Sequence, residues 1–100
     1  MLKHIVVWKF ADNAEGKTKA ENLNIVKDRL YALLPIIPQI KKMEIGIDVS
    51  GTEMSGDMVL ITEFENKEDL KTYAQHPEHV KVSEYVTKVR TSRTVVDYIF

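Results

Sequence analysis

Tyrosine and histidine side chains gather in one short segment of this sequence, the Tyr-x-x-His-Pro-x-His pattern at residues 73–79. The chain has three histidines in all, and the remaining one, His4, lies near the N-terminus. An imidazole titrates at about pH 6.5 and can exchange a proton near neutrality, so His79 could act as a general base. A phenol can donate a hydrogen bond to a carbonyl or an enolate, so Tyr73 could stabilise the oxygen of such a group.

Each of these side chains also has a structural interpretation. His79 could hydrogen-bond backbone groups around Pro77 or in a sheet, and Tyr73 could be an amphipathic core residue on a helix. His76 and His79 are spaced i, i+3, so together with His4 they could form a zinc site. The sequence offers no evident carboxylate to orient these ligands, which counts against zinc. The chemical and the structural interpretations both remain open.

A β-strand is predicted to carry His4. Residues 2–10 alternate, with β-branched and aromatic side chains, and the alternation places His4 on the same face as Trp8. Trp8 could line an apolar pocket or simply fill the core. Further strands are predicted at residues 40–49, 58–64 and 93–100. The glycine-punctuated segment 50–56 indicates a hairpin between the second and third strands.

A first helix is predicted after the first strand. Thr18 and Glu21 have the spacing of a capping box, and Gly16 favours a start at this point over an earlier one. An apolar stripe at helical spacing follows, and two prolines are expected to end it. The stripe comprises Leu23, Val26, Leu30 and Leu33, and the prolines are Pro35 and Pro38.

A second helical region is predicted to carry Tyr73. Asn66 can cap its beginning, and acidic residues follow in the first turn. Pro77 interrupts the region and is well placed to start a further helical stretch. This stretch is expected to run through Val80, Tyr85 and Val89.

The element order β-α-β-β-α-β predicts a ferredoxin-like α+β fold, in which two helices cover one face of a four-stranded antiparallel sheet. Lys9 and Asp97, of opposite charge, could pair across strands. The second face of the sheet carries more apolar surface than a soluble monomer usually exposes to water. We therefore predict a homodimer in which two sheets pack together to form an α/β barrel. That face is expected to carry Ile5, Val7, Ile45, Ile47, Val59 and Ile61.

Length and composition limit the classes of function. One hundred residues of ordinary globular composition predict a single domain over residues 1–100. Fourteen basic against fifteen acidic residues argue against nucleic-acid binding, and the basic cluster Lys88, Arg90 and Arg93 is interpreted as a solvated helix end. The absence of cysteine excludes thiolate chemistry. Without a signal-peptide pattern or a membrane-spanning run, the protein is expected to be cytoplasmic and to bind no membrane.

Several segments resemble the stress-responsive A/B barrel family, often called Dabb. The opening His-Ile-Val-Val-Trp-Lys-Phe at residues 4–10 resembles its first strand, and the resemblance continues through residues 57–64. The Tyr-x-x-His-Pro-x-His segment at 73–79 is its most specific part. The similarity covers essentially the whole chain and implies a ferredoxin-like fold that dimerises through its sheets.

One plant branch of this family consists of polyketide cyclases, which close a linear poly-β-keto thioester by intramolecular aldol condensation. The resemblance to that branch implies catalytic roles for His79, Tyr73 and His4. Met58 stands where that branch has a histidine on its third strand. The ligand pocket is further expected to include Trp8, Met58 and His76.

The resemblance also bears on metal binding. Plant members of the family can hold Mg²⁺ on backbone carbonyls where the first helix ends, and the matching positions are Leu34, Ile37 and Ile40. Carbonyls at a helix C-terminus are unpaired and electron-rich, which suits a hard cation. The nearby prolines can equally be simple helix-stop signals, and no other cofactor is expected.

Three functions are consistent with the sequence. The first is a dimeric protein of unknown specific activity that binds a small apolar or aromatic ligand in a pocket beside His79. The second is a cofactor-independent enzyme, a polyketide cyclase-like lyase, isomerase or monooxygenase acting on a keto substrate. The third is a purely structural stress protein that assembles into larger oligomers. The sharpest expectation is that His4, Tyr73 and His79 converge on one cavity between sheet and helices.

Overall fold

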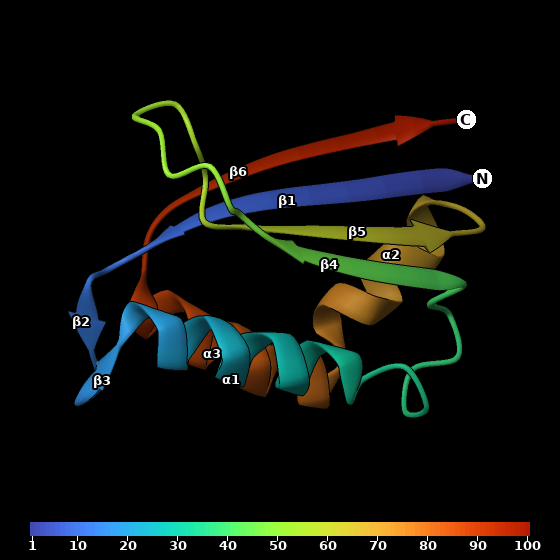
Figure 1. The fold of residues 1–100 in the computed structure, drawn as a ribbon. Coiled ribbons are helices and arrows are strands. Elements are labelled where there is room, and N and C mark those ends of the chain that lie inside the picture. Colours follow the sequence, from blue (N-terminus) through green and yellow to red (C-terminus); the bar gives the residue numbers. More distant parts are fainter.

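Four strands build the main sheet of the computed structural model, which describes residues 1–100 (Figure 1). They are β1 (Leu2–Phe10), β4 (Lys42–Ile47), β5 (Met58–Phe64) and β6 (Arg90–Ile99). Their order across the sheet is β4-β5-β1-β6, and each neighbouring pair is antiparallel. This is the ferredoxin-like arrangement that the element order predicted.

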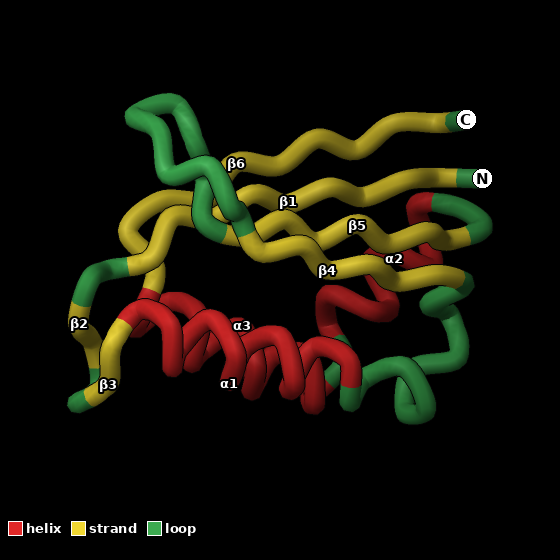
Figure 2. Tube along the Cα trace, in the orientation of Figure 1, coloured by secondary structure: helices red, strands yellow, loops and turns green.

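The helices all cover one face of this sheet, as Figure 2 shows. They are α1 (Lys19–Tyr31), α2 (Lys67–Gln75) and α3 (Pro77–Val89). The second helical region is thus two helices, because His76 is extended and Pro77 opens α3 at its first position. The capping box of Thr18 and Glu21 and the cap at Asn66 are confirmed. None of the three helices has the length and apolar character needed to span a bilayer.

Some boundaries differ from the sequence predictions. The first helix ends at Tyr31, before either proline, because the next residues form tight turns in which the Ile36 and Ile37 amides both donate to the Leu33 carbonyl. The strand expected at 40–49 is shortened to Lys42–Ile47. The last strand begins earlier than expected, at Arg90, directly where α3 ends.

A small hairpin between β1 and α1 was not predicted. Its strands are β2 (Asn13–Ala14) and β3 (Lys17–Thr18). The turn residues Glu15 and Gly16 have φ angles of 53° and 71°, the pair of positive values that a tight type I′ turn requires. The hairpin leads the chain from the end of β1 into the capped start of α1.

The hydrophobic core lies between the sheet and the helices. The predicted alternation of β1 is confirmed, because Leu2, His4, Val6, Trp8 and Phe10 are all buried. The predicted helical stretch through Val80, Tyr85 and Val89 is confirmed as α3, although Val80 itself is exposed and the buried stripe of α3 includes residues that were not predicted. The stripe consists of Val82, Val86 and Val89.

The opposite face of the sheet is also apolar, but its composition differs from the prediction. Ile45 pairs with the buried Leu60 of β5, so Ile45 and Ile47 face the helices. A shift of one residue in strand register exchanges the two faces of a strand. The apolar residues of segment 40–49 did not show which face lies toward the helices. The outer face carries Ile5, Val7, Val59, Ile61, Val96 and Tyr98.

Candidate functional site

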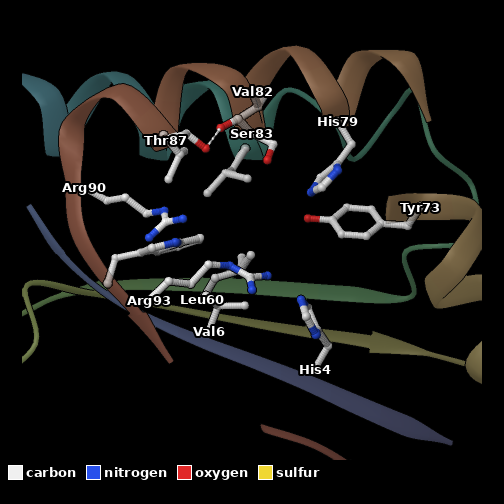
Figure 3. A pocket seen from close by; sticks show the side chains of 13 residues that line it. His4, Val6, Leu60, Tyr73, His79, Val82, Ser83, Thr87, Arg90 and Arg93 are labelled. Atoms are coloured by element: carbon white, nitrogen blue, oxygen red, sulfur yellow. Dashed lines mark hydrogen bonds between the residues drawn. The ribbon is translucent and has the colours of Figure 1, made fainter. Parts of the chain in front are cut away.

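A cavity of about 230 Å³ lies between the sheet and the helices (Figure 3). His4, Tyr73 and His79 all line it, as the sequence analysis expected, and Trp8 lines it too. Its apolar wall comes from the core and comprises Val6, Leu30, Leu60, Val82 and Val86. Its remaining lining residues are Ser83, Thr87, Arg90 and Arg93.

Local structure explains why the three expected residues meet. His4 belongs to the inward row of β1 and is 8% exposed. Tyr73 lies near the end of α2, and Pro77 starts α3 so soon afterwards that His79 returns beside it. The ring centroids of Tyr73 and His79 are 4.3 Å apart, and those of His4 and Tyr73 are 6.5 Å apart.

Two residues expected in the pocket lie outside it. His76 is the residue between α2 and α3, and its Nδ1 accepts a hydrogen bond from the Glu78 amide at 3.1 Å. This is a helix-capping role, and His76 does not line the cavity with the other two histidines. Met58 is a buried core residue and does not line the cavity. Nowhere in the structure do three histidine or carboxylate side chains gather as a metal site.

His79 presents a basic nitrogen to the cavity. Its Nδ1 lies 3.1 Å from the Ala74 carbonyl, which can only accept, so Nδ1 carries the proton. Burial lowers the pKa of His79, the hydrogen bond to Ala74 opposes that change, and the charge of Arg93 lowers the pKa further. The neutral ring with a free Nε2 is therefore favoured at neutral pH.

The Tyr73 hydroxyl is a buried donor without an acceptor in the protein. It forms no hydrogen bond with any protein atom, and Figure 3 shows it directed into the cavity. Burial raises the pKa of Tyr73, with the Arg93 charge acting in the opposite direction, so the phenol keeps its proton. The indole Nε1 of Trp8 is the other buried side-chain atom without a partner. Both belong to residues that line this cavity.

Asp97 orients His4, and this contact was not predicted from the sequence. The register of β1 and β6 places Asp97 directly opposite His4, and its Oδ1 lies 2.5 Å from His4 Nδ1. Nε2 of His4 is then left for the cavity. The expected pairing of Lys9 with Asp97 is wrong, because Lys9 lies opposite Ser92. Finding the His4–Asp97 pair from sequence would have required the register of two strands that lie at opposite ends of the chain.

Arg90 and Arg93 were also missed. They were interpreted as part of a solvated helix end, but α3 stops at Val89 and both arginines belong to β6. Arg93 lies opposite Trp8 and so shares its inward row. The signal that could have revealed this is the strand alternation, which puts Arg93 on the same face as Asp97.

The proposed magnesium ligands lie in the turns between α1 and β4. The Ile37 carbonyl already accepts a hydrogen bond from the Ile40 amide at 3.2 Å. No group of three or more histidine or carboxylate side chains forms a metal site beside these carbonyls. Magnesium binding at the carbonyls of Leu34, Ile37 and Ile40 stays a prediction.

The sequence matches a known protein family and a plant protein that contains the same domain. The family model described as the stress-responsive A/B barrel domain matches residues 2–100. A stress-response A/B barrel domain-containing protein from Arabidopsis thaliana is 31% identical over 100 residues. The match covers 99% of this chain but only 36% of that relative, so the chain spans about a third of its length.

Solved structures share the fold over nearly the whole chain. A dimeric protein of unknown function and ferredoxin-like fold from Bacteroides fragilis is 36% identical with a TM-score of 0.88, covering 99% of this chain and 95% of that one. A hydroxynitrile lyase from Passiflora edulis has a TM-score of 0.80 at 14% identity, covering 99% and 92% of the two chains. At that identity the second likeness concerns the fold alone.

Proposed function

The chain belongs to the stress-responsive A/B barrel family, and from this premise we propose that it binds a small apolar or aromatic ligand bearing a carbonyl group in the cavity of Figure 3. The observation that carries the proposal is the Tyr73 hydroxyl, a buried donor that faces the cavity with no acceptor in the protein. Leaving such a donor unpaired costs about 1–3 kcal/mol. A carbonyl oxygen on a ligand would supply the missing acceptor.

The size and walls of the cavity suit a single ring. A dry cavity of about 150 Å³ holds benzene in another protein, and this one measures about 230 Å³. Aliphatic side chains such as Val6, Leu60 and Val86 form much of its wall. A ring with one or two substituents would bury apolar surface against them while its carbonyl reaches Tyr73.

Acetophenone is a suitable probe for this proposal. Trp8 is the only tryptophan, so its indole N–H gives a single assignable NMR signal from the cavity. We expect acetophenone to shift this signal together with those of His79. Tyr73→Phe should weaken acetophenone binding roughly three- to tenfold, since one hydrogen bond is lost, and leave ethylbenzene binding unchanged. An acetophenone affinity that does not respond to Tyr73→Phe would refute the proposal.

A second function, cofactor-independent proton transfer on a keto substrate, is favoured by His79. With the substrate carbonyl on Tyr73, the neighbouring α-carbon would lie beside the free Nε2 of His79. His79 would take the α-proton, and the electrons of the C–H bond would move onto the carbonyl oxygen to form an enolate. The Tyr73 hydroxyl would stabilise that oxygen, and the protonated His79 would then return a proton to the carbon. His4, held by Asp97, presents its Nε2 to the same cavity.

Deuterium loss from methyl-deuterated acetophenone tests this second function. We expect the protein to accelerate exchange with water, and His79→Ala to lower the accelerated rate by roughly two to four orders of magnitude. His76→Asn is the matched control, because it keeps a helix-capping side chain outside the cavity. Binding without accelerated exchange would leave the ligand-binding function standing and exclude this chemistry for that substrate.

The assembly that we propose is a homodimer joined through the outer faces of two sheets. Ile5 and Ile61 pair at the centre of this apolar face, and Val96 beside them is 55% exposed. The 36%-identical structure from Bacteroides fragilis is described as dimeric. An ion pair of Lys3 and Glu63 lies toward one end of the face, 3.8 Å apart, where a polar rim would be expected.

Light scattering on a surface variant tests the dimer. Ile61→Lys would place a desolvated charge at the centre of the interface, so we expect it to yield monomers at tens of micromolar. Val49→Lys lies in an exposed loop and should leave the dimer intact. A wild-type protein that is monomeric at the same concentration would contradict the assignment.

A further inference from the structure

Two cationic side chains enter the cavity from the sheet. Arg90 is both the C-cap of α3 and the first residue of β6, and Arg93 follows on the inward row of the same strand. Figure 3 shows Arg90 on the side of the cavity away from Tyr73, and the Arg93 side chain extending from that side toward the middle. Neither guanidinium takes part in any of the salt bridges of the structure.

The cavity holds no negative charge to balance these arginines. None of its 13 lining residues is acidic. The carboxylate nearest in the strand pattern, Asp97, is already engaged with His4. Of the two hydroxyl residues on α3 that line it, Thr87 donates to the Ser83 backbone carbonyl at 2.9 Å. The arginine side of the cavity is therefore positive and uncompensated.

The polar groups on this side are also nearly all donors. A guanidinium has five N–H donors and no acceptor, and the unpaired indole Nε1 of Trp8, opposite Arg93 in the strand register, can only donate. A ligand that satisfies them must bring acceptors and negative charge. A carboxylate does both, since its two oxygens match the fork of a guanidinium.

We propose that the ligand of this cavity carries a carboxylate group bound by Arg90 and Arg93, in addition to the carbonyl group near Tyr73. This inference rests on the proposed function, because it names the chemical class of the ligand for the same cavity. The ligand class is then an aromatic or apolar keto acid. The arginines are specificity-determining residues in this assignment.

Benzoate and benzamide form a matched pair of probes, because they have nearly the same shape and differ in charge. We expect the protein to bind benzoate at least about tenfold more tightly than benzamide, as charged hydrogen bonds exceed neutral ones. Binding is followed through the Trp8 indole signal. The preference should weaken as salt is raised, because Arg90 is only half-buried and Arg93 is exposed to solvent.

Arginine variants locate the source of the preference. Arg93→Gln and Arg90→Gln should each reduce the benzoate preference, and the double variant should abolish it. Lys88→Gln is the control, because this lysine is exposed on α3 and does not line the cavity. Arg93→Lys should recover only part of the preference, since an ammonium keeps the charge but lacks the fork.

Two outcomes would overturn the inference: wild-type protein that binds benzamide as tightly as benzoate, or a preference that survives in the double variant. Its failure is separable from that of the proposed function. Acetophenone is uncharged, and its affinity should depend on Tyr73 and not on the arginines. If acetophenone binds through Tyr73 while benzoate shows no preference, only the carboxylate assignment fails. If benzoate binds through the arginines while acetophenone ignores Tyr73→Phe, only the carbonyl assignment fails.

Discussion

Tyr85 on α3 and Tyr73 on α2 differ in what surrounds their hydroxyl groups. The Tyr85 hydroxyl donates to Asn22 Oδ1 at 2.6 Å, and Asn22 Nδ2 donates in turn to the Ala14 carbonyl at 3.0 Å. The Arg29 guanidinium lies 4.4 Å above the Tyr85 ring. For the Tyr73 hydroxyl, by contrast, the protein provides no acceptor.

This difference distinguishes a polar network that stabilises the fold from polar groups that are left available to a ligand. The Tyr85 network joins α1, α3 and the β2–β3 hairpin, and the buried Asn22 has partners for both its amide oxygen and its amide nitrogen. Natural proteins satisfy nearly all buried polar groups, and the exceptions concentrate at functional sites. The unpaired donors of Tyr73 and Trp8 face one cavity, so their partners are expected on a ligand.

Removing Asn22 should have the largest effect. Asn22→Ala leaves the Tyr85 hydroxyl and the Ala14 carbonyl unpaired and opens a void, so the free energy of unfolding should fall by about 2–4 kcal/mol. Urea denaturation followed by circular dichroism measures it. Asn24→Ala, on the exposed side of the same helix, should change stability by less than about 0.5 kcal/mol. Equal effects of the two substitutions would contradict the structural role of the network.

A smaller loss is expected from Tyr85→Phe. It removes only the hydroxyl and leaves Asn22 Oδ1 without its donor, which should cost about 1–2 kcal/mol. Because Tyr85 does not line the cavity, the affinity for acetophenone should stay the same. A loss of acetophenone binding in this variant would show that the two regions are not separate.

The pH dependence of stability should reveal the half-buried imidazole of His79. Burial lowers the pKa of His79 in the folded state below its ordinary 6.5, so the unfolded chain binds the proton more tightly. The free energy of unfolding should therefore fall as the pH drops below about 6.5, until the folded-state pKa is passed, and level off above neutrality. His79→Asn should reduce this slope and His76→Asn should not, as measured by denaturation across pH. A wild-type slope equal to that of His79→Asn would contradict a lowered pKa of His79 in the folded state.

The subtlest expected effect is electrostatic. The Arg93 charge lowers the pKa of His79, so Arg93→Gln should raise it, whereas Lys88→Gln should leave it in place. Titration of the His79 ring signals by NMR distinguishes the two variants. An unchanged His79 pKa in Arg93→Gln would mean that this arginine points away from the cavity in solution.

Local spacing explains what the sequence predicted well. Alternation along β1 placed His4 and Trp8 inward, and the proline within the Tyr-x-x-His-Pro-x-His segment brought His79 back beside Tyr73. Each of these inferences uses neighbours within a few residues. The ferredoxin-like fold followed from the order of such local elements.

Non-local pairing explains what was missed. The inward placement of Arg93 and Asp97 depends on the register of β6 against β1, which no local pattern sets. The same one-residue ambiguity put Ile45 on the wrong face of the sheet. His76 was expected in the pocket because of its motif, but its backbone position between two helices makes it a cap.

The most direct test measures Tyr73→Phe and Tyr85→Phe side by side, each for its free energy of unfolding and its affinity for acetophenone. We expect opposite effects: one variant should lose affinity and the other should lose stability. Tyr73→Phe should raise the free energy of unfolding by up to about 1–3 kcal/mol, because it removes a buried hydroxyl that has no protein partner. It should also bind acetophenone roughly three- to tenfold more weakly, because the hydrogen bond to the ligand carbonyl is lost. Tyr85→Phe should lose stability and keep its affinity. If Tyr73→Phe is destabilised as much as Tyr85→Phe while its acetophenone affinity is unchanged, the Tyr73 hydroxyl serves the fold and the cavity is not a ligand site of the kind described.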